Sequence, residues 1–134
     1  MNNIIVVSMD NELSKQVAKY LAKELNLSYV NLNLVYEKEL LLDVKKSVFN
    51  EDASTKEKNI VAHFAKQKDV VIAIENEMFL SNKNYELCKN NSSLLIETEL
   101  QNEIEQNLQN LLKNHCKICV KDKDLNKIIT LIKG

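Results

Sequence analysis

Polar side chains that could carry chemistry follow three apolar runs of this sequence. Asp10 comes shortly after the run NIIVVS, Asn31 and Asn33 lie in the run SYVNLN, and Glu75 and Glu77 lie at the end of DVVIAIENE. Carboxylates gathered in one crevice could bind a cation or an amine, although acids at strand ends are more often simply solvated. An amide can orient a hydroxyl group but cannot act as a general base. These residue types favour a binding crevice over an acid–base catalytic site.

A second candidate is the segment HCKIC, which begins at His115 and places a C-x-x-C pair beside a histidine. A structural zinc site needs four ligands, and no second Cys/His pair completes one, because Cys88 and His63 are isolated. On a strand, Cys116 and Cys119 would point to opposite faces, which is poor geometry for a chelate. We interpret both as buried strand cysteines and expect neither a metal nor a redox site.

The composition indicates a globular protein. The chain has 134 residues, of which 45% are hydrophobic and 28% are charged, and this balance excludes a disordered polypeptide. A net charge of −1 provides no basic field, so we expect no nucleic acid and no membrane as a partner. We expect no signal peptide, and the apolar runs are far shorter than the roughly 20 residues that cross a bilayer. Because three cysteines form no disulfide framework, the sequence predicts a cytoplasmic protein with reduced thiols.

Residue types that usually hold anionic ligands are scarce. All 18 basic residues are lysines, so the chain lacks the arginine fork that grips phosphates and carboxylates. The single glycine is Gly134, so a ligand-wrapping loop cannot use the positive φ of glycine. Asparagine, which occurs 18 times, is the next best residue for left-handed caps and turns.

Alternating elements must position these side chains. Apolar β-branched runs predict strands at residues 3–8, 28–33, 69–75, 93–97 and 116–120. Helical spacing predicts helices at residues 12–26, 83–90, 99–115 and 125–133, and a helical region at residues 34–67 that breaks near residues 50–53. This alternation predicts one α/β domain over residues 1–134, a three-layer αβα arrangement with helices on both faces of a five-stranded parallel sheet. The turn after the first strand is then the default ligand site.

From Ile4 to Asn33 the sequence resembles, without a gap, the opening of the shikimate kinases. The similarity covers the first strand, the turn, the helix AKYLAKELNL and the second strand, and it continues with small shifts to Glu99. Shikimate kinases are small P-loop kinases that phosphorylate shikimate with ATP and magnesium. The resemblance implies a P-loop-kinase-like fold with the strand order 2-3-1-4-5.

The phosphate-binding loop of that family is degenerate in this sequence. The family pattern is G-x-x-x-x-G-K-[ST], in which the glycines let backbone N–H groups surround phosphates and the lysine reaches the β- and γ-phosphates. The corresponding segment reads Ser8, Met9, Asp10, Asn11, Glu12, Leu13, Ser14 and Lys15, so both glycines are replaced and the last two residues are exchanged. We interpret it as a helix start, with Asp10 or Asn11 as N-cap and Glu12 favourable to the helix dipole, rather than as an ATP site.

Lys15 is the strongest objection to that interpretation, because it could reach back to a phosphate. It lies one residue beyond the lysine position of the family, about 100° further around the helix. We therefore expect Lys15 to point away from the loop, and we expect neither ATP nor Mg²⁺ to bind.

Other parts of the family site are replaced as well. The resemblance places Asn31 and Asn33 at a D-x-D that serves the metal and the shikimate hydroxyl, and Lys58 at a substrate-binding arginine. It places the triplet ENE at the Gly-Gly-Gly that meets shikimate. Only residues 99–115 lie between the last two strands, where the family has an arginine-bearing lid and a further helix. The candidate crevice thus consists of Asn31, Asn33, Lys58, Glu75, Asn76 and Glu77.

Taken together, these replacements predict a degenerate, lid-less shikimate-kinase-like protein that is catalytically inactive. Its predicted role is binding or regulation, toward an unknown protein partner or small ligand. Two alternatives stay open. One is an active or weakly active shikimate kinase, which ATP-dependent phosphorylation of shikimate would reveal. The other is a small-ligand or cation sensor that uses the acid-lined crevice at the strand ends.

Overall fold

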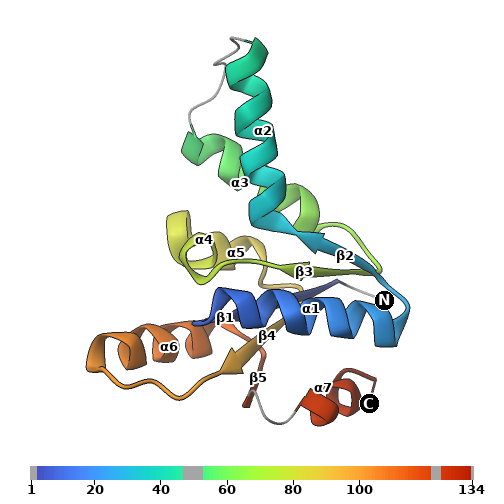
Figure 1. Cartoon of the computed structure of the whole chain (residues 1–134), viewed down its shortest axis with the longest axis vertical. Coiled ribbons are helices and arrows are strands. Elements are labelled where there is room, and N and C mark those ends of the chain that lie inside the picture. Colours follow the sequence, from blue (N-terminus) through green and yellow to red (C-terminus); the bar gives the residue numbers. More distant parts are fainter. Residues whose placement is uncertain (1–2, 47–52, 122–124, 134) are drawn as a thin grey trace.

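A single parallel sheet organises the computed structural model, which describes residues 3–46, 53–121 and 125–133. Its strands are β1 (Ile4–Ser8), β2 (Ser28–Asn31), β3 (Val70–Ala73), β4 (Ser92–Glu97) and β5 (Ile118–Lys121). They lie in the order β2-β3-β1-β4-β5, and every neighbouring pair is parallel. The strand order and the parallel pairing that the sequence predicts are therefore confirmed (Figure 1).

Helices connect the strands. They are α1 (Asn11–Leu25), α2 (Leu32–Lys46), α3 (Ala53–Ala65), α4 (Asn76–Leu80), the 3-10 turn η1 (Ser81–Lys83), α5 (Asn84–Leu87), α6 (Glu103–His115) and α7 (Leu125–Lys133). Asn26 ends α1 in the left-handed conformation, with φ 56° and ψ 46°, as predicted for an asparagine that replaces glycine. The predicted helix break near residues 50–53 lies mostly outside the described residues.

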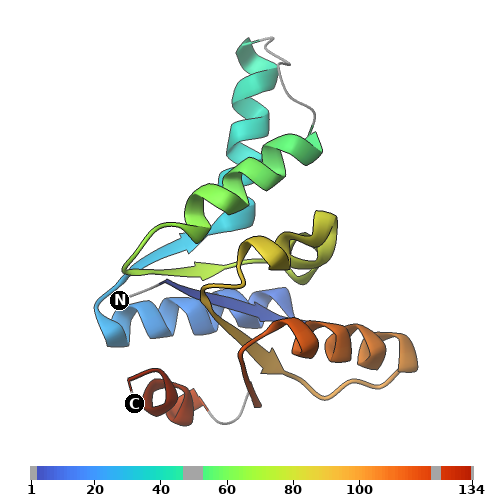
Figure 2. The ribbon, with the colours of Figure 1, turned by 180° about the vertical axis from the view of Figure 1, so that it is seen from behind.

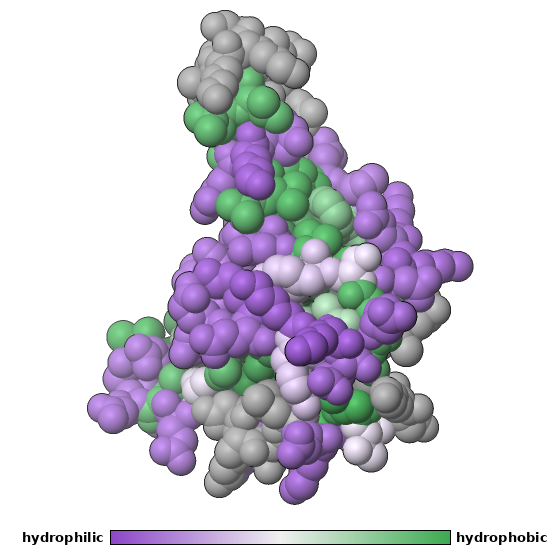
Figure 3. All heavy atoms as spheres, turned by 45° about the vertical axis from the view of Figure 1, so that its right-hand side comes forward, coloured by the Kyte–Doolittle hydropathy of each residue, from purple (hydrophilic) through white to green (hydrophobic). Residues whose placement is uncertain are grey.

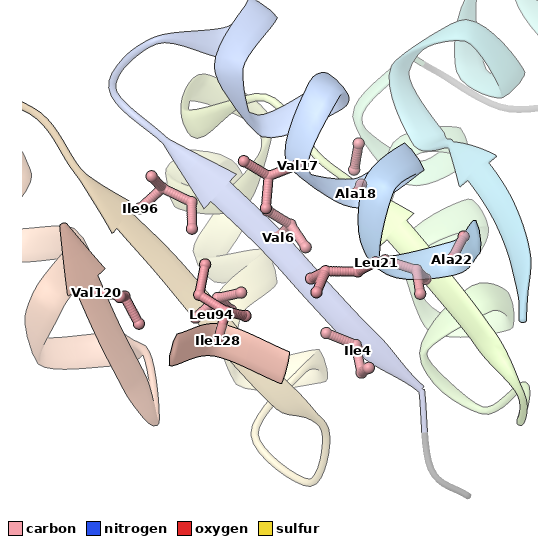
Figure 4. Close-up of a cluster of buried hydrophobic side chains, with 12 residues drawn as sticks. Ile4, Val6, Val17, Ala18, Leu21, Ala22, Leu94, Ile96, Val120 and Ile128 are labelled. Carbon is pink, nitrogen blue, oxygen red and sulfur yellow. The ribbon is translucent and has the colours of Figure 1, made fainter. Parts of the chain in front are cut away.

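The buried side chains form one cluster on each face of the sheet. Alternate residues of β1 point to opposite faces, so Ile4 and Val6 pack against α1 and α7, with Leu21 and Ile128 (Figure 4). The second cluster joins the other face to α2, α3, α4 and α6 through Leu32, Val61, Phe79 and Leu112, among others. Helices thus cover both faces, and the predicted three-layer αβα arrangement is confirmed.

The parallel register brings the carboxyl ends of the strands to one edge of the sheet. Ser8 pairs with Ile96, Asn31 with Ala73, and Glu97 with Lys121. Residues that follow these strands therefore meet at the same edge, which positions the candidate site.

Two boundaries at this edge differ from the prediction. β2 ends at Asn31, and Asn33 lies in the first turn of α2. The reason is a cap, because Asn31 Oδ1 accepts a hydrogen bond from the Leu34 N–H at 3.2 Å. A further helix, α4, was not predicted, and it begins at Asn76, two residues after the buried Ile74.

α2 and α3 together project from the layers as an arm (Figures 1 and 2). Leu34, Leu41 and Leu42 of α2 keep 44%, 55% and 43% of their surface exposed, and hydrophobic surface is visible along the arm (Figure 3). Among the described residues, no helix is long and apolar enough to cross a membrane.

Candidate functional site

The turn between β1 and α1 is short and closed by hydrogen bonds of its own side chains. Only Met9 and Asp10 separate the strand from the helix. Ser8 is buried, and its hydroxyl donates to the Ile96 carbonyl at 2.9 Å and accepts from the Asp10 N–H at 3.1 Å. The strand therefore runs into the helix without an open loop.

Asp10 is the N-cap of α1. Its Oδ1 accepts hydrogen bonds from the N–H groups of Glu12, at 3.0 Å, and Leu13, at 3.2 Å. Residues Asn11 to Leu13 are helical, and the described residues with positive φ all lie elsewhere in the chain. Leu13 is consequently not strained, because the glycine-like loop conformation is absent and a helical turn takes its place.

Asn76 closes the turn from the side of β3. Its Nδ2 donates to the Ser8 carbonyl at 3.0 Å and to the Met9 carbonyl at 3.2 Å, and its backbone N–H donates to Asn11 Oδ1 at 3.1 Å. Asn11 Nδ2 in turn donates to Glu77 Oε2 at 3.1 Å. Asn76 is only 7% exposed, so these amides fill the space beside the turn.

Glu75 lies next to this cluster with a partly buried carboxyl group. Its backbone N–H donates to Asn33 Oδ1 at 2.9 Å, while its Oε2 is buried without a hydrogen-bond partner among the described residues. Burial, followed by the negative charges of Glu77 and Glu37, raises the pKa of Glu75, and the positive charge of Lys15 partly offsets them.

The exchanged pair Ser14 and Lys15 is engaged within α1. Ser14 is buried, and its hydroxyl donates to the Asn11 carbonyl at 2.9 Å. Lys15 Nζ lies 2.6 Å from Glu12 Oε1, and this hydrogen bond is the main cause of its raised pKa. The long side chain of Lys15 bends back along α1 to reach Glu12, and the expectation that it points away from the turn stays a prediction.

The predicted crevice residues are only partly brought together. Asn33, Glu75, Asn76 and Glu77 lie in one cluster beside the turn. Asn31 serves as the cap of α2. Lys58 is exposed on α3, and no hydrogen bond or ion pair between described residues joins it to this cluster.

A cavity opens on the other side of Asp10, toward β4 and α6. Its volume is about 720 Å³, which is in the range of small-molecule sites. Its lining combines apolar side chains with charged ones, of which four are acidic and one is basic. They are Met9, Leu13 and Leu100 with Asp10, Glu97, Glu99, Glu105 and Lys121. Gln109 joins α6 to the segment after β4 at the cavity wall. Its side chain accepts from the Thr98 N–H at 3.0 Å and donates to the Thr98 carbonyl at 3.1 Å.

Most residues of this cavity were missed by sequence reasoning. A signal existed, because Glu97 ends a predicted strand just as Glu75 does, and carboxyl ends of parallel strands meet at one edge. The acids are nevertheless dispersed, since no group of three His, Cys, Asp or Glu side chains within the described ranges is arranged to hold a metal ion. The segment from β4 to β5 contains α6 alone in this part of the chain.

The cysteines differ from the prediction in orientation. β5 begins at Ile118, and Cys116 is the C-cap of α6, so strand alternation does not relate Cys116 to Cys119. Both side chains pack against the same core cluster as the buried Cys88. Burial raises the pKa of Cys88 and of Cys116 to about 12, which disfavours the thiolate form of both side chains. His115 stacks on Tyr85, with ring centroids 3.7 Å apart.

Comparisons with known proteins agree on one family. The sequence model of the shikimate kinase family matches residues 15–131, a range that begins inside α1. Among curated proteins, none matches the sequence. The structure is similar to the shikimate kinase of Acinetobacter baumannii in complex with shikimate, with a TM-score of 0.71 and 19% identity over 99% of this chain and 93% of that chain.

Two further shikimate kinases have the same fold. The enzyme of Bacteroides thetaiotaomicron matches with a TM-score of 0.70 and 11% identity, over 99% of both chains. The enzyme of Aquifex aeolicus matches with a TM-score of 0.69 and 13% identity, over 99% of this chain and 94% of that chain. The family model matches most of the length of this chain, and the order of the strands agrees with it. This chain therefore belongs to the shikimate kinase family.

Proposed function

We propose that this member of the family does not phosphorylate shikimate and instead has a binding or regulatory role. The observation that carries the proposal is the capped turn. A helix N-terminus binds phosphate through N–H groups that no other group occupies. Here Asp10 accepts two of those N–H groups itself, so the residues present do not fit the phosphates of ATP.

Electrostatics supports the same proposal. Asp10 and Glu12 put two carboxylates where a polyanionic nucleotide would lie. Two like charges 4 Å apart oppose each other by about 4 kcal/mol at an effective dielectric of 20. Lys15 is held by Glu12, so its charge is already compensated locally.

The substrate side is also altered. Asn76 and Glu77 bond to Asn11 and the turn, which fills the place that glycines leave open in the family pattern. Asn33 offers an amide that cannot remove a proton, and it already accepts from the Glu75 N–H. An anionic substrate would face the carboxylates of Glu75 and Glu77 without an arginine to hold it.

The test combines an activity assay with a binding assay. We expect no ATP-dependent phosphorylation of shikimate above a no-enzyme blank, with an active shikimate kinase as positive control. We also expect no rise in melting temperature with excess ATP and Mg²⁺, since a ligand at 100 times its Kd would stabilise by about 2.7 kcal/mol. A rise that disappears in Lys15→Ala, or measurable phosphorylation, would overturn the proposal.

A small cationic ligand is a second candidate function, favoured by the cavity beside Asp10. Its acids are dispersed rather than grouped for a metal, and apolar side chains lie among them. Such a lining suits an aliphatic diamine or polyamine, whose charges are separated by methylene groups. We expect spermidine to raise the melting temperature more than Mg²⁺ at equal ionic strength. Asp10→Asn, which retains a capping residue, should weaken the effect, whereas Glu24→Gln on the exposed side of α1 should not.

A further inference from the structure

α5 is a short helix that lies between the arm and α6 (Figures 1 and 2). Two consecutive residues before it have the left-handed conformation, Asn82 with φ 53° and ψ 22° and Lys83 with φ 55° and ψ 39°. Asparagine tolerates this conformation, whereas a lysine in it is strained, because its Cβ crowds the backbone. Such strain persists only where contacts of the surrounding residues hold the backbone in place.

The first contact that holds α5 is with the arm. Asn84, the residue after Lys83, is fully buried. Its Nδ2 donates to Glu57 Oε1 of α3 and to the Met78 carbonyl of α4, both at 2.7 Å. A hydrogen bond to a carboxylate is stronger than one between neutral groups, so the side chain of Asn84 ties the start of α5 firmly to α3.

The second contact is with α6. The ring of Tyr85 stacks on the ring of His115, with centroids 3.7 Å apart and an angle of 18° between the planes. Tyr85 also packs on the core cluster that contains Leu112 of α6. α6 in turn contributes Glu105 and Gln109 to the lining of the cavity. Two adjacent residues of α5 thus contact the arm and the helix that forms the cavity wall.

We propose that α5 is a strained link that couples the arm to the wall of the cavity. The two contacts together hold Lys83 in its left-handed conformation. Loss of either contact lets the backbone at Lys83 relax, and the resulting shift of α5 loosens the other contact. A ligand that shifts α6 therefore changes the mobility of the arm, and a partner that binds the arm changes the cavity by the same free energy.

The coupling has to pass through the elements between the two contacts. Among the described residues, Glu57 and His115 share no hydrogen bond, ion pair or ring contact. Substitutions at separate sites without a shared partner usually act independently, so an effect of one site on the other reports the link. The inference goes beyond the proposed function, because none of these contacts involves the capped turn.

Amide hydrogen exchange of the full chain tests the link. Glu57→Ala should speed exchange in α3 and also in α6, and His115→Ala should speed exchange in α6 and also in α3. The remote effect should be about two- to thirtyfold, the range of coupling between distant sites. Two matched controls should have no remote effect. Lys58→Ala changes an exposed neighbour of Glu57 on α3, and Lys113→Ala removes the ion pair of α6 with Glu97.

Lys83→Asn tests whether backbone strain carries the coupling. Asparagine tolerates the left-handed conformation, so this substitution alone should raise the melting temperature, and α5 should stay in place when one contact is lost. In the Lys83→Asn background the remote effects of Glu57→Ala and His115→Ala should disappear, while their local effects remain.

Three results would overturn the proposal. The first is the absence of remote effects when Lys83 is retained. The second is remote effects of equal size in the Lys83→Asn background. The third is an acceleration of exchange in β1 as large as the remote effect, because general loss of stability would then explain the result.

Discussion

Asp10 caps the start of α1 with its own carboxylate. Its carboxylate accepts the N–H groups of Glu12 and Leu13, and the partial positive charge of the helix start is neutralised from within. In the glycine-rich pattern of the family an external phosphate makes those contacts. In this chain one aspartate at the helix start makes two such contacts itself.

The cap predicts a clear difference between two variants of Asp10. Asp10→Ala removes the acceptor and should lower the free energy of unfolding by about 0.5–2 kcal/mol, while Asp10→Asn retains a good cap and should cost less. Urea unfolding followed by circular dichroism measures both. Equal losses in the two variants would show that charge, rather than the capping hydrogen bonds, stabilises this helix start.

Glu75 predicts a pH dependence of stability. Its folded pKa is raised above the ordinary 4.5, so the folded state holds the proton more tightly than the unfolded chain. The contribution of Glu75 to the free energy of unfolding is therefore fully present below pH 4.5. It is lost as the pH rises through the raised pKa of the folded state. Glu75→Gln should remove that loss. The melting temperature of the variant should therefore exceed that of the wild type by more at pH 7 than at pH 4. Glu24→Gln is the control, and an unchanged pH profile in Glu75→Gln would contradict the assignment.

The residues of the site differ in how far the sequence could reveal them. The cap at Asp10 follows from local rules, because its partners lie two and three residues away. The role of Asn76 could not be found in this way. Its bonds to the carbonyls of Ser8 and Met9 span 68 and 67 residues, so they exist only once β1 and β3 are paired.

Elements were predictable where periodicity is long and uninterrupted. The sequence of α1 has apolar residues at regular helical spacing followed by Asn26. In the structure the helix forms, and Asn26 ends it in the left-handed conformation. α4 was missed because five residues are too few to establish a period. The strand–helix boundary at Asn31 was misplaced because the alternation of SYVNLN continues through a residue whose side chain caps the next helix.

The packing of α6 on the core depends on one buried side chain. Leu112 is fully buried in the core cluster, and the other residues of α6 are partly or fully exposed. Leu112→Ala should lower the free energy of unfolding by about 2–5 kcal/mol, because it leaves a cavity under α6. Leu111→Ala, at a 42% exposed position one residue away, should change stability by about 0.5 kcal/mol or less. Thermal and urea melts at low protein concentration compare the two, and a similar loss in both would contradict the described packing.

At the scale of the whole molecule, topology decides where open space remains. The strand order could be expected from the family resemblance, and with it the edge at which the candidate residues gather. The position of the cavity could not, because it depends on how α6 lies against β4 and on the closure of the β1–α1 turn by Asn76. The space on the β3 side is filled by amides, and the space on the β4 side remains open.

The two-faced core also predicts how stability is distributed over the molecule. β1 and β3 are buried along their whole length, β4 is buried in its centre, and the outer strands β2 and β5 are partly exposed. Amide hydrogen exchange should therefore be slowest in β1, β3 and β4, where exchange requires global unfolding. It should be faster in α2 of the projecting arm and in α6, which contribute few buried side chains. Protection in α6 that equals that of β1 would contradict this distribution.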